Sequence, residues 1–241
     1  MVLGLAPRSI GGHTKAMVRH RRLVILIVSL GLSLFAVLSV VPPGEPPQQS
    51  PSGSVPGAAS QALESLPVKG RAAKTGYSRG EFGSGWKLVN GCDTRQIILF
   101  RDLTQTVIDD DCTVLSGVLN DPYTATIIRF NRQQSDAVQI DHVVALSDAW
   151  QKGAQQLSRQ ERIALANDPL ELLAVDGPAN QEKSDSDAAS WLPPNKSFRC
   201  EYVARQIAIK QKYRLWVTEA EKRAMQSVLE GCPAMSLPGS Y

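Results

Sequence analysis

From residue 114 onward, short stretches of β-favouring residues alternate with longer stretches in which apolar residues recur at helical spacing. Four stretches predict strands: residues 114–119, 124–130, 137–140 and 170–175. The first two flank an Asp-Pro-Tyr turn, which predicts a small antiparallel element. Residues 96–103 fit a short strand or the middle of a helix, and propensity does not decide between them.

Helical patterns follow the same part of the chain, at residues 147–154, 158–166, 202–215 and 218–229. Ser158 and Glu161 have the spacing of a capping box, which opens the second of these helices. A further helix is predicted to begin at Asp176-Gly177-Pro178, with the carboxylate as its cap and proline in its first turn. Asn180 and Lys183 would then share a face that looks back at the strand ending near residue 141.

The N-terminal quarter differs from the rest of the chain. Residues 1–22 form a basic arm, residues 23–41 are an apolar run without a charge, and residues 42–69 are rich in Pro, Gly, Ser and Gln. Such a composition buries too little apolar surface to offset its ordering entropy, so we expect a linker there. A single folded domain is predicted over residues 70–233, followed by a tail at 234–241.

The apolar run predicts export. As a helix its 19 residues span about 28 Å, close to a bilayer core, and Lys15, Arg19, Arg21 and Arg22 precede it. By the positive-inside rule the arm stays in the cytoplasm and the domain is exported. The run is longer than the apolar core of most signal peptides and lacks an A-x-A site. We therefore expect a single-pass membrane anchor with an extracellular domain, or a secreted protein if the segment is a cleaved signal.

All four cysteines fall in the predicted domain, at Cys92, Cys112, Cys200 and Cys232. Their spacing contains no C-x-x-C, and the exported side is oxidising, so two disulfides are favoured over a structural zinc site. Their spacing alone permits three pairings. Residues 82 and 86, a phenylalanine and a tryptophan in an irregular segment, are expected in the core.

The net charge of +3 comes from the arm, because the sequence from Gly70 onward is close to neutral. Within the domain, residues 196–223 carry more basic than acidic side chains, which fits a track for a phosphate backbone or an ordinary solvated helix face. The three carboxylates of residues 109–111 lack an EF-hand pattern, so a solvated turn is favoured over a calcium site.

His142 is the only histidine beyond the first twenty residues. This excludes a three-His zinc site, an H-E-x-x-H protease and a second histidine acting with a serine. Neighbouring side chains on a strand point to opposite faces, so Asp141 and His142 can serve one site only at a strand end or a bulge.

A series of short motifs follows the chain in order. They are Tyr77-Ser78-Arg79 with Phe82-Gly83 and Trp86, Cys92-Asp93-Thr94-Arg95, Asp121-Pro122-Tyr123-Thr124, Asp141-His142, Ala166-Asn167-Asp168-Pro169, Asn180 with Lys183, Trp191-Leu192-Pro193-Pro194 and Arg199-Cys200-Glu201-Tyr202. With these motifs the chain resembles the HNH (ββα-metal) nuclease family, in particular its secreted, cysteine-containing DUF1524 branch. Ala145 stands where that family usually has proline, and Ser184 where glycine is common.

The resemblance implies an α+β fold in which a ββα-metal nuclease core is embedded in additional helices and a small antiparallel β element. It implies a metal-dependent endonuclease that hydrolyses the phosphodiester bonds of nucleic acid, in the first place DNA. His142 would be the general base, and Asp141 with Asn180 would bind one divalent cation, Mg²⁺ or Mn²⁺. Lys183 would meet a phosphate, with Arg95 a weaker candidate for the same contact. With sequence proximity, the resemblance favours the disulfides Cys92–Cys112 and Cys200–Cys232.

Two other classes of function stay open at this point. A membrane-tethered binding module would keep the fold without turnover, and the presence of Asp141, His142 and Asn180 together argues against it. A hydrolase of another extracellular polymer is less favoured, because no separated carboxylate pair stands out as acid and nucleophile or base. No protein partner is predicted.

Overall fold

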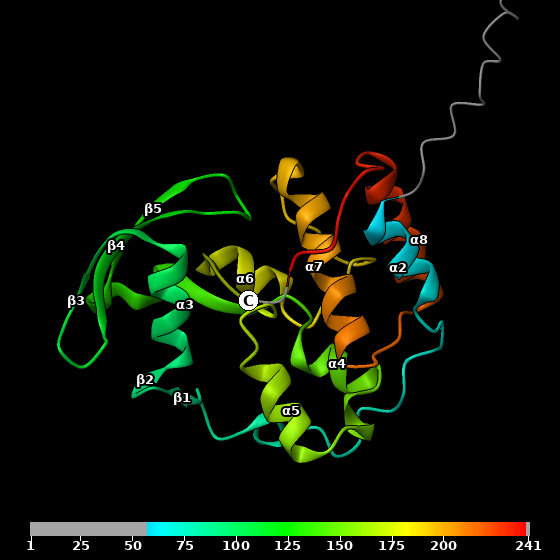
Figure 1. Cartoon of the computed structure of the whole chain (residues 1–241), viewed down its shortest axis with the longest axis horizontal. Coiled ribbons are helices and arrows are strands. Elements are labelled where there is room, and N and C mark those ends of the chain that lie inside the picture. The colour runs from blue at the N-terminus through cyan, green and yellow to red at the C-terminus, as the bar shows by residue number, and fades with distance from the viewer. Residues whose placement is uncertain (1–56, 240–241) are drawn as a thin grey trace, which may run out of the picture. The chain divides into compact units, whose positions relative to one another are not determined.

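Three small antiparallel sheets lie beside a group of helices in residues 57–239, the part of the chain that the computed structural model describes (Figure 1). The α+β class predicted from the sequence is confirmed. The sheets are formed by β1 (Leu88–Val89) with β2 (Cys92–Asp93), by β3 (Thr104–Ile108), β4 (Val114–Asn120) and β5 (Ile127–Asn131), and by β6 (Val138–His142) with β7 (Leu172–Asp176).

The helices divide between two hydrophobic cores. The larger core is formed mainly by helices. The smaller core lies between the strands β4 to β7 and the helix that follows Cys92. The α-helices are α2 (Ala58–Ser65), α3 (Thr94–Asp102), α4 (Leu146–Gln151), α5 (Arg159–Ala166), α6 (Gly177–Lys183), α7 (Arg199–Lys212) and α8 (Glu219–Glu230). Short 3-10 turns are η1 (Arg79–Phe82), η2 (Arg132–Ala137), η3 (Ala154–Gln156) and η4 (Lys196–Phe198).

The strands β6 and β7 pair antiparallel along their whole length, and α6 follows β7 and packs against both. Asp176 caps α6 by accepting a hydrogen bond of 2.8 Å from the backbone N–H of Ala179, and Pro178 lies in the first turn. The helix entry read from the sequence is thus confirmed. Asp141 and His142 are the last two residues of β6, which is the strand end that a shared site requires.

Local sequence signals were accurate for most other elements. Ser158 and Glu161 form the expected capping box of α5, and β4 pairs with β5 as predicted, while β3 adds a strand that the pattern did not reveal. The ambiguous residues 96–103 are helical up to Asp102, in a helix that Asp93 caps by accepting a hydrogen bond from the N–H of Gln96.

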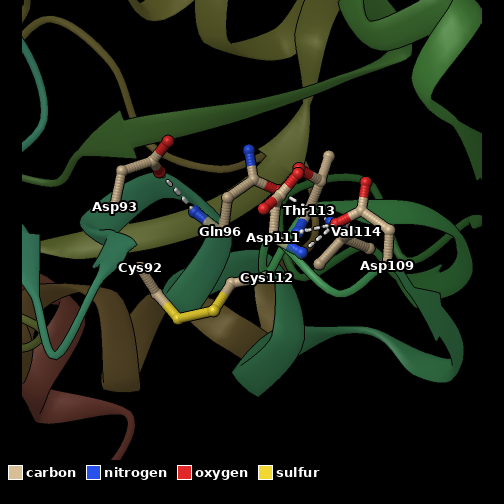
Figure 2. The surroundings of a disulfide bond; sticks show 8 residues. All are labelled: Cys92, Asp93, Gln96, Asp109, Asp111, Cys112, Thr113 and Val114. Atoms are coloured by element: carbon tan, nitrogen blue, oxygen red, sulfur yellow. Dashed lines mark hydrogen bonds between the residues drawn. A yellow bond between two sulfur atoms is a disulfide. The ribbon is translucent and has the colours of Figure 1, made fainter.

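Both disulfides pair as the resemblance implied, Cys92 with Cys112 and Cys200 with Cys232. The first ties the start of α3 to the loop between β3 and β4 (Figure 2). In that loop Asp109 accepts hydrogen bonds from the backbone N–H groups of Asp111 and Thr113, at 3.1 and 2.7 Å, so the acidic run closes a turn. Within residues 57–239, no group of three or more His, Cys, Asp or Glu side chains is placed to hold a metal ion.

The predicted domain boundaries are too narrow at both ends. Residues 58–65, assigned to the linker, form α2, in which Ala59 and Leu63 are fully buried in the larger core. Met235 and Leu237, assigned to the tail, pack against the same core. The linker was predicted from average composition, and the Pro, Gly and Ser residues around α2 outweigh the few apolar residues of its buried face in that average. The basic arm, the apolar run 23–41 and the linker up to residue 56 lie outside the described residues, and among residues 57–239 no helix is long and apolar enough to cross a membrane.

The basic residues of 196–223 fit neither interpretation of the sequence well, because several of them are buried or paired with carboxylates. Lys210 is fully buried with its ammonium 2.9 Å from Oε1 of Glu221, in a network where Lys152 contacts three carboxylates. The other pairs are Arg205–Glu201, Lys212–Asp168, Arg214–Glu161, Lys222–Glu64 and Arg223–Glu219. The stretch therefore presents little uncompensated positive charge.

Candidate active site

An open cavity of about 210 Å³ lies where β6 ends, between α6 and residues 77–79. The sequence-predicted residues Asp141, His142 and Asn180 all line it. Tyr77, Arg79 and Asp185 complete its polar wall. The structure thus brings together three of the residues that the sequence singled out, from a strand end and a helix that are 38 positions apart in the chain.

Asp141 is held from inside the protein. Its Oδ1 accepts a hydrogen bond of 2.8 Å from the ammonium of Lys183, and its Oδ2 accepts one from the hydroxyl of Tyr123. Lys183 and Tyr123 are both fully buried, and burial raises the pKa of Tyr123 well above its usual value, so the phenol keeps the proton it donates. The carboxylate is therefore fixed in one orientation at the cavity wall.

His142 is fixed through one ring nitrogen. Its Nε2 lies 3.0 Å from the carbonyl oxygen of Ala166, which can only accept a hydrogen bond, so Nε2 carries the proton in the neutral ring. Within residues 57–239 no hydrogen bond forms at Nδ1, the nitrogen with the free lone pair. Burial lowers the pKa of His142 from its ordinary value of 6.5 to about 3. The imidazole is therefore neutral across the physiological range, with the lone pair of Nδ1 unprotonated.

Trp86 stacks on His142, with ring centroids 5.8 Å apart and planes within 5° of parallel. The two rings line a second cavity of about 120 Å³, which also involves Arg79 and Phe82. The expected core position is confirmed for Phe82, which is 2% exposed, and Trp86 is partly buried and packs against the smaller core. His142 and Arg79 line both cavities, so the two spaces adjoin at these side chains.

Asn180 is half-buried, and its Nδ2 donates a hydrogen bond of 2.9 Å to Oε1 of Gln139. This bond leaves its amide oxygen without a partner in the described part of the chain. Asp185 is exposed and forms an ion pair of 2.9 Å with Lys74. Asp141, Asn180 and Asp185 each offer a side-chain oxygen as a metal ligand, and the imidazole of His142 is the only nitrogen ligand among these residues. Oxygen ligands of this kind fit Mg²⁺ or Mn²⁺, with water completing the coordination.

The other two predicted residues lie elsewhere. Lys183 is fully buried. Its ammonium donates a hydrogen bond to Asp141 and a second one, of 2.8 Å, to the carbonyl oxygen of His142. This burial does not fit the expected direct contact of Lys183 with a phosphate. Arg95 lines neither cavity, and its Nη2 lies 3.4 Å from the carbonyl oxygen of Val138 at the start of β6.

Arg79 and Trp86 are two residues at this site to which the sequence analysis assigned no function. Both are part of matching motifs in the family resemblance, but neither sits in a pattern that identifies a chemical role. Their segment reaches the site through long-range contacts: Arg162 forms an ion pair of 2.9 Å with Glu81, and the ring of Tyr77 packs against Trp150. Such contacts leave no signal in the local sequence.

Residues 93–228, more than half of the chain, match the family described as GmrSD restriction endonucleases, C-terminal domain, and the chain belongs to that family. The match includes Asp141, His142 and Asn180, but begins after Arg79 and Trp86.

A particular relative comes from the fungus Arthroderma benhamiae and is described as an uncharacterized secreted protein. It is 37% identical over 204 residues, which cover 83% of this chain and 96% of the relative. No solved structure matches the chain.

Proposed function

We propose that the chain is an exported, HNH-type endonuclease that hydrolyses phosphodiester bonds of nucleic acid, in the first place DNA. The observation that carries this proposal is the convergence of Asp141, His142 and Asn180 on one cavity. Membership of a family named for restriction endonucleases gives independent support. In this proposal β6, β7 and α6 are the ββα-metal core.

His142 acts as the general base. Its Nε2–H bond to Ala166 holds the ring and leaves the lone pair of Nδ1 to take a proton from the attacking water. A neutral ring is the form that this step requires, although a pKa of about 3 makes the buried imidazole a weak base. Trp86 stacks on the ring and keeps its plane fixed.

Asp141 and Asn180 would hold one divalent cation, Mg²⁺ or Mn²⁺, through a carboxylate oxygen and the free amide oxygen. When bound, such a cation stabilises negative charge on the phosphate and the leaving oxygen. Lys183 and Tyr123 hold the carboxylate of Asp141 in one orientation by hydrogen bonds from the protein side. Lys183 thus acts in the proposed reaction by positioning Asp141.

Export agrees with the two disulfides and with the secreted relative. Residues 23–41 would be either a membrane anchor or a cleaved signal. Fractionation separates the two possibilities, because an anchored protein stays with membranes whereas cleavage yields a soluble form that begins after residue 41.

Digestion of supercoiled plasmid by the full-length protein tests the activity, with Mg²⁺, Mn²⁺ or excess chelator, and with His142→Ala as the control. We expect nicked and linear products with a divalent cation, none with chelator, and a rate roughly 10²- to 10⁴-fold lower from the variant. A protein that binds the plasmid without cutting it under any of these conditions would be a binding module, and the proposal would fail.

A further inference from the structure

We infer that the guanidinium of Arg79 is the phosphate-binding group of this site and holds the phosphodiester next to His142. The inference rests on the proposed function and names the residue that recognises the substrate's backbone. It replaces Lys183 and Arg95, the two cations that the sequence suggested for that contact.

The balance of charge around the cavity singles out Arg79. The carboxylate of Asp141 is paired with Lys183 at 2.8 Å, and that of Asp185 is paired with Lys74 at 2.9 Å. Arg79 is exposed, and its guanidinium forms no hydrogen bond or ion pair with any other residue of the described chain. One positive charge at the cavity is therefore uncompensated, and a phosphodiester carries the single negative charge that would neutralise it.

The position of Arg79 fits the same role, because its side chain lines both the cavity with Asp141 and Asn180 and the adjoining cavity with Trp86. A phosphate bound there would lie beside His142, which also lines both spaces. A guanidinium binds two phosphate oxygens at once in a fixed geometry, which an ammonium cannot do.

The backbone at Arg79 is held in place although the side chain is free. In η1, which begins at Arg79, the next two residues are tied to α5: Arg159 donates to the carbonyl oxygen of Gly80, and Arg162 pairs with Glu81. The ring of Tyr77 packs against Trp150 on the other side. Because the backbone is already anchored, binding a ligand costs only the entropy of ordering the Arg79 side chain itself.

The test compares Arg79→Ala, Arg79→Lys and Arg95→Ala with Arg223→Ala in the full-length protein. Arg223 is an exposed arginine on α8, so its loss changes the net charge equally. Affinity for a short fluorescein-labelled DNA duplex is measured at several salt concentrations with chelator present, so that nothing is cut. Turnover of the same duplex is measured separately with Mg²⁺.

We expect Arg79→Ala to weaken DNA binding roughly tenfold and to reduce the slope of log affinity against log salt by about 0.9, the share of one phosphate contact. Arg79→Lys should recover the slope but only part of the affinity. Arg79 is exposed, so thermal unfolding should be unchanged. If Arg79→Ala matches Arg223→Ala in affinity and slope, or if only Arg95→Ala shows these losses, the inference is overturned. Absence of cleavage by the wild-type protein would instead overturn the proposed function.

Discussion

The ammonium of Lys183 lies 2.8 Å from Oδ1 of Asp141, and both groups are almost completely enclosed by the protein. The sequence suggested that Lys183 contacts a phosphate of the substrate. The distance and burial make it instead an internal partner of the candidate metal ligand. A buried ion pair of this kind is costly to break, because removing one charge leaves the other desolvated and unpaired.

Replacement of Lys183 should therefore affect stability before substrate binding. We expect Lys183→Met to lower the free energy of unfolding by about 3–5 kcal/mol. The salt dependence of DNA binding by the remaining folded protein should stay unchanged, because no phosphate contact is lost. Urea unfolding and fluorescence binding measure the two effects, with the exposed Lys196→Met as the control. An unchanged stability together with a flatter salt dependence would restore the original assignment.

The dependence of turnover on metal concentration should distinguish the proposed general base, His142, from the proposed metal ligands, Asp141 and Asn180. His142→Ala should lower turnover roughly 10²- to 10⁴-fold, the usual contribution of a general base, without changing the metal concentration needed for half-maximal rate. Asn180→Ala removes a proposed metal ligand, so its loss of rate should be partly recovered at higher metal concentration, and Asp141→Ala should show a larger shift. Rate is measured against Mg²⁺ concentration for each variant. Wild-type turnover by His142→Ala would refute the mechanism.

The low pKa of His142 predicts how stability changes with pH. In the unfolded chain the imidazole takes up a proton as the pH falls below about 6.5, whereas in the folded protein it stays neutral until about pH 3. The unfolded state therefore binds more protons in this window, and the free energy of unfolding should fall as the pH decreases, by up to about 1.4 kcal/mol per pH unit.

His142→Gln removes this titration, so the difference in stability between wild type and variant should change across the window from pH 6.5 to 4. Urea unfolding at a series of pH values measures it. A difference that stays constant with pH would mean that the imidazole is not protected from protonation in the folded protein.

The disulfide between Cys92 and Cys112 predicts a second stability effect. It closes a loop over a sequence separation of 20 and fastens the turn at Asp109 to the start of α3. In the loop-entropy model, replacing both cysteines by serine should cost about 3 kcal/mol of unfolding free energy. Unfolding of the double variant, with peptide mapping of the wild type without reduction, measures this. Free thiols in the mapped protein would contradict the pairing.

Local sequence determined the elements that carry the catalytic candidates. The strand ending at Asp141 and His142, the cap of α6 at Asp176 and the capping box at Ser158 all depend on residues within a few positions of one another. These elements depend on backbone propensity and local hydrogen bonds, both of which can be predicted from residues close together in the sequence. That α6 turns Asn180 towards β6 followed from the same local pattern.

Only the tertiary structure decided what surrounds those residues. Arg79 and Trp86 reach His142 through contacts across more than fifty positions of the chain, and the burial of Lys183 depends on packing from several elements at once. The pKa of His142 likewise follows from its burial, which no local pattern encodes. The sequence by itself determined which residues have the chemistry for catalysis, whereas long-range packing decided which of them face the cavity and which support it from within.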